Sequence, residues 1–170
     1  AALVELARRL AALPDDAPRR RVVLIAFTAE DLGLLGSAHY VKEPLFPLDK
    51  TVAMFNMDMV GRLQDDKLTI FGSGTAKRWD EMIDSLAKEY GFTVTKKPEG
   101  FGPSDHSSFY GKQIPVLHFF TGTHKDYHRP GDDWEKINPA GMRRVVEMIE
   151  RMVLDTATTE PRPEYVAVKS

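Results

Sequence analysis

The stretch "RVVLIAFTAEDLGLLGS", residues 21–37, decides the fold because it joins an apolar run to an acidic turn and a helix. The run at 21–28 is continuous and rich in β-branched residues, a pattern typical of a strand buried on both faces. A predicted helix follows at 32–41, and Pro44 and Pro47 close it. A buried strand that leads directly into a helix indicates an α/β domain.

The same alternation continues along the chain. Further strands are expected at 51–60, 67–72, 92–97 (as an edge strand) and 114–121, and helices at 1–13, 76–91, 105–112 and 138–154. This pattern predicts a three-layer α/β/α domain with a mostly parallel central sheet. In such sheets, ligands bind beyond the carboxyl ends of the strands.

Composition limits the classes of function. The chain has 170 residues, of which 42% are hydrophobic and 28% charged, and its net charge is −2. That balance gives no reason to expect nucleic acid or a membrane as partner, and no apolar run is long enough to span a bilayer. Because cysteine is absent, any metal must be held by His, Asp and Glu.

Acidic and imidazole side chains gather at or just after the predicted strand ends. They are Glu30, Asp31, Asp58, Asp105, His106, His118 and His128. Carboxylates and histidines are ligands that zinc accepts, and one carboxylate left unbound can act as a base. The set is therefore the inventory that a two-metal hydrolase needs.

Each of these residues also has a simpler interpretation. Glu30 and Asp31 can complement the N-terminus of the following helix, and Asp105 is a suitable helix-cap residue. His118, in an apolar strand, can be a satisfied core histidine. Asp58 is harder to explain, since a carboxylate in a buried run is costly unless it is paired or bound to metal. The simple interpretation is credible for each residue alone, but less so for all of them together.

Four segments resemble successive signatures of the zinc-dependent exopeptidases of the co-catalytic aminopeptidase family. They are "FTAEDLGLLGSAHYV", "NMDMVG", "SDHSSF" and "GKQIPVLHFFTGTHKDYHRPGDD". This family includes di-zinc aminopeptidases, glutamate carboxypeptidases and glutaminyl cyclases, with the transferrin receptor ectodomain as a non-enzymatic relative. The resemblance implies the zinc-exopeptidase (phosphorylase/hydrolase-like) fold, and it covers nearly the whole chain.

The resemblance assigns roles by position. Glu30 matches the general base, and Asp31 matches the metal-binding acid beside it, which is most often Glu in the family. Asp58 matches the carboxylate ligand of the other zinc, and His128 matches the last histidine ligand. Zinc would activate a water molecule for hydrolysis, with two ions in a complete site.

Other positions are implied to surround the substrate. Asp105 and His118 resemble residues that line the site in the cyclase branch. His106 and Tyr127 are expected as substrate or second-shell neighbours, and Asp133 is expected to orient the histidine ligand.

In the family, a His-x-Asp histidine and a bridging aspartate lie before the helix that "AALVELARRLAA" resembles, so both are expected to be missing from this chain. We therefore expect residues 1–155 to be the C-terminal portion of a peptidase catalytic domain, with its N-terminal strands missing, and 156–170 to be a tail or linker. The expected partners are a peptide substrate and the missing N-terminal half. Partial or absent zinc occupancy and little or no activity are expected for this chain alone.

The function implied is an aminopeptidase that hydrolyses N-terminal residues from peptides. A glutaminyl cyclase-type, single-zinc acyltransferase and a receptor-like binding module of the same fold are the alternatives. The surviving Glu30, Asp58 and His128 argue against the binding module, which need not keep them. Analogy with the family places the protein in a secreted or periplasmic location.

Overall fold

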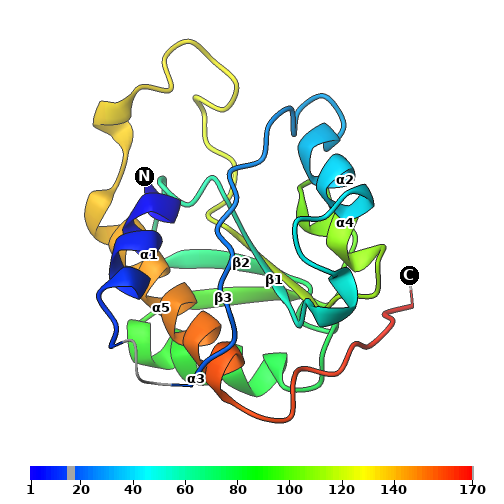
Figure 1. Ribbon diagram of the computed structural model, residues 1–170. Coiled ribbons are helices and arrows are strands. Elements are labelled where there is room, and N and C mark those ends of the chain that lie inside the picture. The colour runs from blue at the N-terminus through cyan, green and yellow to red at the C-terminus, as the bar shows by residue number, and fades with distance from the viewer. Residues whose placement is uncertain (15–17, 170) are drawn as a thin grey trace.

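A four-stranded sheet forms the centre of the molecule, in a computed structural model that describes residues 1–14 and 18–169 (Figure 1). Its strands are β1 (Met54–Asp58), β2 (Lys67–Phe71), β3 (Thr93–Lys97) and β4 (Val116–Phe120). They lie in the order β1-β4-β2-β3. β1 and β4 are parallel, β2 and β3 are parallel, and β2 and β4 are antiparallel. The predicted, mostly parallel sheet is confirmed, and β3 lies at an edge.

Helices cover both faces of this sheet, which confirms the three layers. One face carries α1 (Ala2–Ala11), α3 (Trp79–Tyr90) and α5 (Pro139–Thr158), and the other carries α2 (Leu35–Lys42) and α4 (His106–Tyr110) (Figure 1). Two short 3₁₀ helices, Leu48–Lys50 and Trp134–Lys136, lie in the connections. In the part of the chain that the structure describes, no helix is long and apolar enough to cross a membrane.

A large buried cluster packs β4 and the rest of the sheet against the helix layer of α3 and α5. Leu117 and Phe119 of β4 are fully buried, as is Trp79 at the start of α3. The Trp79 ring lies 5.7 Å from the ring of Phe55, and its Nε1–H donates to Thr75 Oγ1 at 3.2 Å. A buried tryptophan with a satisfied N–H fixes α3 against the sheet.

Helix α5 begins as its sequence predicts and ends later. The Asn138 side chain accepts a hydrogen bond from the N–H of Gly141 at 2.9 Å, and Pro139 occupies the first turn. The helix continues to Thr158, beyond the predicted end at 154. Beyond it, the N–H of Val166 donates to the Thr75 carbonyl at 2.8 Å. Part of the predicted tail therefore lies against the domain.

The strand predicted at 21–28 is wrong for this structure. The segment is extended, but among the described residues no strand pairs with it, and Val23 and Leu24 are 41% and 38% exposed. An apolar run becomes a strand only when a neighbouring backbone supplies hydrogen bonds. Here β1 lies across an apolar groove that both segments line.

Candidate active site

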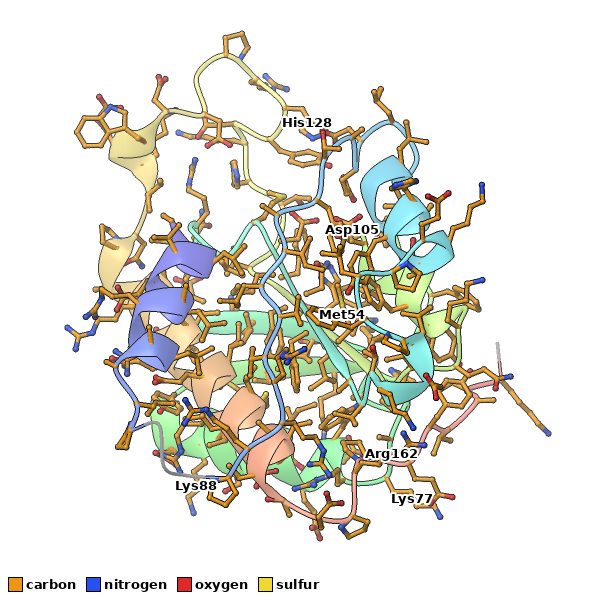
Figure 2. The ribbon with its side chains drawn as sticks, in the orientation of Figure 1. Met54, Lys77, Lys88, Asp105, His128 and Arg162 are labelled. Atoms are coloured by element: carbon orange, nitrogen blue, oxygen red, sulfur yellow. The ribbon has the colours of Figure 1, made fainter. Side chains whose placement is uncertain are left out.

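A polar pocket of about 510 Å³ lies at the carboxyl end of β1. Most of the predicted site residues line it, namely Glu30, Asp31, Asp58, Tyr127 and His128. Figure 2 shows His128, on the loop after β4, and Asp105, at the start of α4, on the same side of the molecule. The structure therefore brings acids and imidazole together where the carboxyl-end rule predicts a site.

Glu30 and Asp31 sit in a tight turn rather than on a helix. The Glu30 carbonyl accepts hydrogen bonds from the N–H groups of Gly33 and Leu34 at 3.0 and 2.9 Å. Gly33 and Leu34 have φ of 101° and 61°, so the helix predicted from 32 begins only at Leu35. No side-chain hydrogen bond caps this helix, and its first turn holds no acid. The helix-cap interpretation of the acidic pair is therefore not supported.

Gly36 explains the sequence "GLLGS" after the acidic pair. Its N–H donates to the Thr28 carbonyl at 3.1 Å. A Cβ atom at Gly36 would lie 2.6 Å from that carbonyl oxygen, closer than atoms can approach without a shift. Only glycine allows α2 to start this close to the end of the 21–28 segment, which fixes the turn that carries Glu30.

Asp31 and His128 approach each other at the rim of the pocket. Asp31 Oδ1 lies 3.6 Å from His128 Nε2, and both side chains are largely exposed. This distance is too long for a hydrogen bond. Two ligands of one tetrahedral zinc, each about 2.1 Å from it, lie about 3.4 Å apart. The pair therefore fits two ligands of one zinc ion.

The described residues do not supply a closed metal site. Within the described ranges, no three His, Asp or Glu side chains are grouped closely enough to hold a metal ion. A catalytic zinc normally has three protein ligands. Asp58 lines the same pocket as the Asp31–His128 pair but does not complete it. The carboxylate and imidazole side chains of the pocket are of types that bind zinc. One pair, Asp31 and His128, also lies at a suitable distance.

Glu30 has the electrostatic environment of a proton acceptor. Burial raises the pKa of its carboxyl group, and the negative charges of Asp58, Asp31 and Asp105 raise it further. A hydrogen bond with Ser104 acts in the opposite direction. A carboxylate whose pKa is raised toward neutrality is a better general base, since it holds and releases a proton near the working pH.

Asp105 is buried beside the pocket. Burial is the main cause of the raised pKa of its carboxyl group, and the charge of Asp58 adds to it. Its Oδ1 has no hydrogen-bond partner among the described residues. Asp105 is thus linked to the pocket through charge, and its role toward substrate stays a prediction.

His106 and His118 form a stacked, buried pair and do not line the polar pocket. Their ring centroids are 4.4 Å apart with an interplanar angle of 10°, and both side chains are buried. His118 Nδ1 lies 3.0 Å from Asn56 Nδ2, which also donates to Ser104 Oγ at 2.8 Å. Burial lowers the pKa of His106 to about 4 and, together with the neighbouring ring, that of His118 to about 3. Both rings are therefore neutral at pH 7.

The loop that carries His128 is held by ion pairs that the sequence did not suggest. Arg62, just after β1, donates to Asp126 at 2.9 Å and also to Asp132. Lys136 contacts Asp126 at 2.8 Å. Lys136 and Arg62 lower the pKa of Asp126 to about 2. The contacts of Arg62 tie the loop to the end of β1.

Two neighbouring acids follow His128, and the structure places them differently. Asp132 lines the pocket, whereas Asp133 is exposed and precedes the short helix with Trp134, which is 77% exposed. No described hydrogen bond joins Asp133 to His128. The His128 ring stacks instead on the ring of Tyr127, with the two ring centroids 3.9 Å apart. The predicted role of Asp133 therefore stays a prediction.

The fold and the pocket define a class. A three-layer α/β/α domain with acids and a histidine at its carboxyl-end edge is typical of metal-dependent hydrolases. The family model for Peptidase family M28 matches residues 1–153. The chain belongs to this peptidase family.

Individual relatives agree with this assignment. The chain is 29% identical to aminopeptidase YwaD of Bacillus subtilis over 178 residues, covering 96% of the chain and 37% of that protein. A solved zinc aminopeptidase of B. subtilis matches with a TM-score of 0.77 and 29% identity, covering 94% of the chain and 40% of that structure. An aminopeptidase of Aneurinibacillus sp. strain AM-1 gives a TM-score of 0.75 and 26% identity, with 99% and 40% covered. The chain thus spans about two fifths of these relatives.

Proposed function

We propose that the protein acts in a zinc-dependent aminopeptidase that removes N-terminal residues from peptides. The observation that carries the proposal is the placement of Glu30 in one pocket with Asp31, His128 and Asp58. The names of the relatives support zinc and aminopeptidase activity. A secreted or periplasmic location is part of the same proposal.

The surroundings of each pocket residue indicate its role in the proposed reaction. Asp31 and His128 would hold one zinc, and Asp58 would contribute to a second. Bound zinc would supply an activated water molecule and polarise the scissile carbonyl. Glu30, with its raised pKa, would accept the proton of that water and pass it to the leaving amine. The acids of the pocket would attract the charged N-terminus of a peptide.

The remainder of the catalytic domain is part of the proposal. The relatives are more than twice as long as the matched region, and the described residues offer no third ligand for a zinc. We therefore expect full activity to need a further segment as partner.

The test is hydrolysis of leucine p-nitroanilide by the full-length protein with zinc. Glu30→Gln should lower kcat by about 10²-fold or more, because it removes the base. Zinc content should stay unchanged. The control Glu43→Gln alters an exposed carboxylate outside the pocket and should have no effect. Full activity in Glu30→Gln would overturn the role of Glu30, and zinc-dependent activity of residues 1–170 alone would overturn the need for a partner.

One observation keeps the cyclase alternative open. The raised pKa of Asp105 suits a carboxyl group that moves protons, as a glutaminyl cyclase-type site would require. Mass spectrometry of a Gln-initiated peptide after incubation with the full-length protein separates the two. Loss of the whole residue supports an aminopeptidase, whereas loss of ammonia supports a cyclase.

A further inference from the structure

His128, the predicted histidine ligand, lies on a loop that extends away from the sheet after β4 (Figure 1, yellow). Its side chain is 62% exposed, and its ring stacks on that of Tyr127, which belongs to the same loop. The position of the imidazole opposite Asp31 therefore depends on how the backbone of the loop is held.

The loop has an ordered backbone of its own. The N–H of Tyr127 donates to the His124 carbonyl at 3.0 Å, and the N–H of Arg129 donates to the Asp126 carbonyl at 2.9 Å. His128, between these turns, has a φ of 53°, in the left-handed region that few residues other than glycine adopt. Such a conformation persists where the surrounding structure fixes it. The turns shape the loop, but they do not attach it to the sheet.

Arg62 supplies the attachment. Its Nη2 donates to Asp126 Oδ2 at 2.9 Å, and its Nη1 donates to Asp132. These two acids lie two residues before and four residues after His128. In the described part of the chain, no other hydrogen bond joins residues 122–136 to the rest of the molecule. One guanidinium group thus holds the loop on both sides of the histidine.

The backbone that carries Arg62 is itself fixed. The carbonyl of Gly61 accepts a hydrogen bond from the N–H of Asn138 at 2.9 Å, and the next side chain, Leu63, is buried. A guanidinium group presents several N–H donors in a planar fork, so it can bind two carboxylates at once. Arg62 is therefore a rigid anchor just beyond the end of β1.

The charge of the pocket makes this anchor necessary. Glu30, Asp31, Asp58 and Asp132 all line the pocket, and like charges repel each other at this range. Arg62 is a cation in contact with one of them, Asp132. Without it, the negative charge of the pocket would push Asp132, and the loop with it, away from Asp31.

We propose that Arg62 positions His128 for zinc, by holding the loop so that the imidazole faces Asp31 before the metal binds. The inference rests on the proposed function for the identity of the ion. Arg62 contacts the loop and does not line the pocket, so it is a positioning residue. It should therefore control zinc affinity and leave the proton transfer proposed for Glu30 unchanged.

Other roles for this cluster fit less well. The Arg62 side chain is only 13% exposed and its donors are directed at two carboxylates, so it is not free to bind a substrate. Lys136 contacts Asp126 at 2.8 Å, but it belongs to the same connection and cannot attach the loop to β1. Arg62 is the member of the cluster that joins the loop to the sheet.

The first test uses the zinc-free full-length protein and limited digestion by chymotrypsin. Cleavage after Tyr127, followed by mass spectrometry, should be about tenfold faster in Arg62→Met, because a released loop opens more often. Cleavage after Tyr90, at the end of α3, should be unchanged and shows that the domain stays folded. Equal cleavage after Tyr127 in Arg62→Met and wild type would overturn the proposal.

The second test measures zinc affinity by competition with a chelator. Arg62→Met should weaken zinc binding by about tenfold or more, since groups that orient a metal ligand typically change affinity by this amount. At saturating zinc, kcat for leucine p-nitroanilide should stay within about twofold of wild type, because the base is intact. Unchanged zinc affinity, or a loss of kcat that zinc does not restore, would contradict a positioning role.

Matched variants identify the feature of Arg62 that matters. Arg62→Lys keeps the charge but reaches one acid at a time, so its zinc affinity should lie between those of wild type and Arg62→Met. Lys136→Met and Arg151→Met remove cations that do not join the loop to β1, and each should change zinc affinity by less than about threefold. Wild-type affinity in Arg62→Lys, or an equal loss in Lys136→Met, would overturn the two-sided hold by Arg62.

The digestion needs neither zinc nor substrate, so its outcome is independent of the proposed peptidase activity. A full-length protein that holds the loop through Arg62 but hydrolyses no peptide would contradict the proposed function alone.

Discussion

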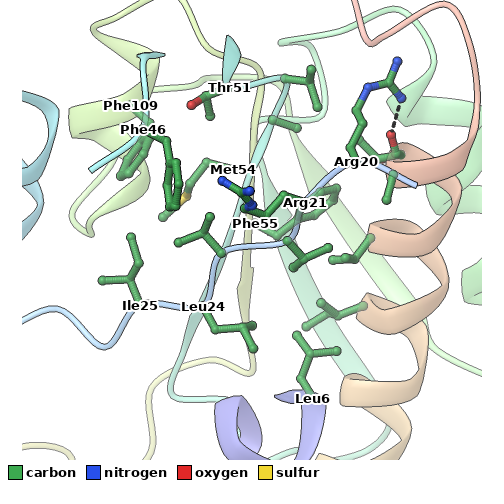
Figure 3. Close-up of a pocket in the computed structure, with 18 of the residues that line it drawn as sticks. Leu6, Arg20, Arg21, Leu24, Ile25, Phe46, Thr51, Met54, Phe55 and Phe109 are labelled. Carbon is green, nitrogen blue, oxygen red and sulfur yellow. Dashed lines mark hydrogen bonds between the residues drawn. The ribbon is translucent and has the colours of Figure 1, made fainter. Parts of the chain in front are cut away.

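The two edges of β1 differ in what lies beside them. On one edge, β4 pairs with β1 residue by residue from Met54 to Asp58, and both are covered by helices. On the other edge, the same helix layers continue, but the apolar groove separates β1 from the extended segment 21–27 (Figure 3). The edge of β1 that pairs with β4, here called the closed side, is packed. The edge that faces the groove, here called the open side, is not, although both are apolar. An apolar run can therefore be buried in a sheet, but it forms a strand only where a neighbouring backbone supplies hydrogen bonds.

The largest expected effect is a loss of folding stability in acid, caused by two histidines buried on the closed side of β1. The buried His106 and His118 are neutral in the folded chain because burial lowers their pKa values to about 4 and 3. The unfolded chain binds protons on both below about pH 6.5. The stability that the two neutral histidines contribute is therefore fully present above about pH 6.5 and is lost as the pH falls. From pH 7.5 to 5, urea unfolding should show a loss of about 2 kcal/mol for each histidine.

Variants separate this effect from general acid sensitivity. His106→Phe removes one buried titrating ring and should reduce the loss by about half. His39→Gln, at an exposed position, should leave the loss unchanged. An equal loss in wild type and His106→Phe would show that the closed side does not hold a neutral histidine there.

The next effect compares one leucine from each side of β1. Leu117→Ala in β4 empties a fully buried position and should cost about 3 kcal/mol of unfolding free energy. Leu24→Ala, on the open side, should cost less than about 1 kcal/mol, because that side chain is already 38% exposed. Chemical denaturation of both variants measures the difference. Equal costs would mean that the groove is closed in solution.

The smallest effect tests how α1 is fixed to the closed side. Arg9 Nε donates to Glu150 Oε2 of α5 at 2.6 Å, and both side chains are mostly buried. Arg9→Met should cost about 1 kcal/mol or slightly more. Arg151→Met breaks an exposed pair with Glu89 and should cost less than about 0.5 kcal/mol. A larger cost for Arg151→Met than for Arg9→Met would show that the Arg9–Glu150 pair is not the stronger of the two ion pairs.

Much of the fold could be predicted from local pattern. The strands near 51–60 and 114–121 and the helix at 76–91 are confirmed because their periodicity and their caps lie within the segment itself. The run at 21–28 carries an equally strong pattern, but its outcome depends on a neighbouring backbone that local sequence does not describe. The helix expected from 32 begins at Leu35, since Gly33 and Leu34 have positive φ, which a right-handed helix does not allow.

The site was predictable as far as strand ends define it. Glu30, Asp58 and His128 line one pocket because the ends of 21–28, β1 and β4 meet at one edge. The ion pairs of Arg62 with Asp126 and Asp132 were missed. They join residues 64 and 70 positions apart, and a basic residue after a strand gives no signal of its distant partner.

The two tryptophans give the molecule natural optical reporters. Trp79 is fully buried beside Phe55, while Trp134 is 77% exposed on the loop after His128. Fluorescence from Trp79 should be blue-shifted and shielded from acrylamide, and fluorescence from Trp134 should be red-shifted and readily quenched. Unfolding of the sheet and movement of the loop can therefore be followed separately in one unlabelled sample, at two emission wavelengths.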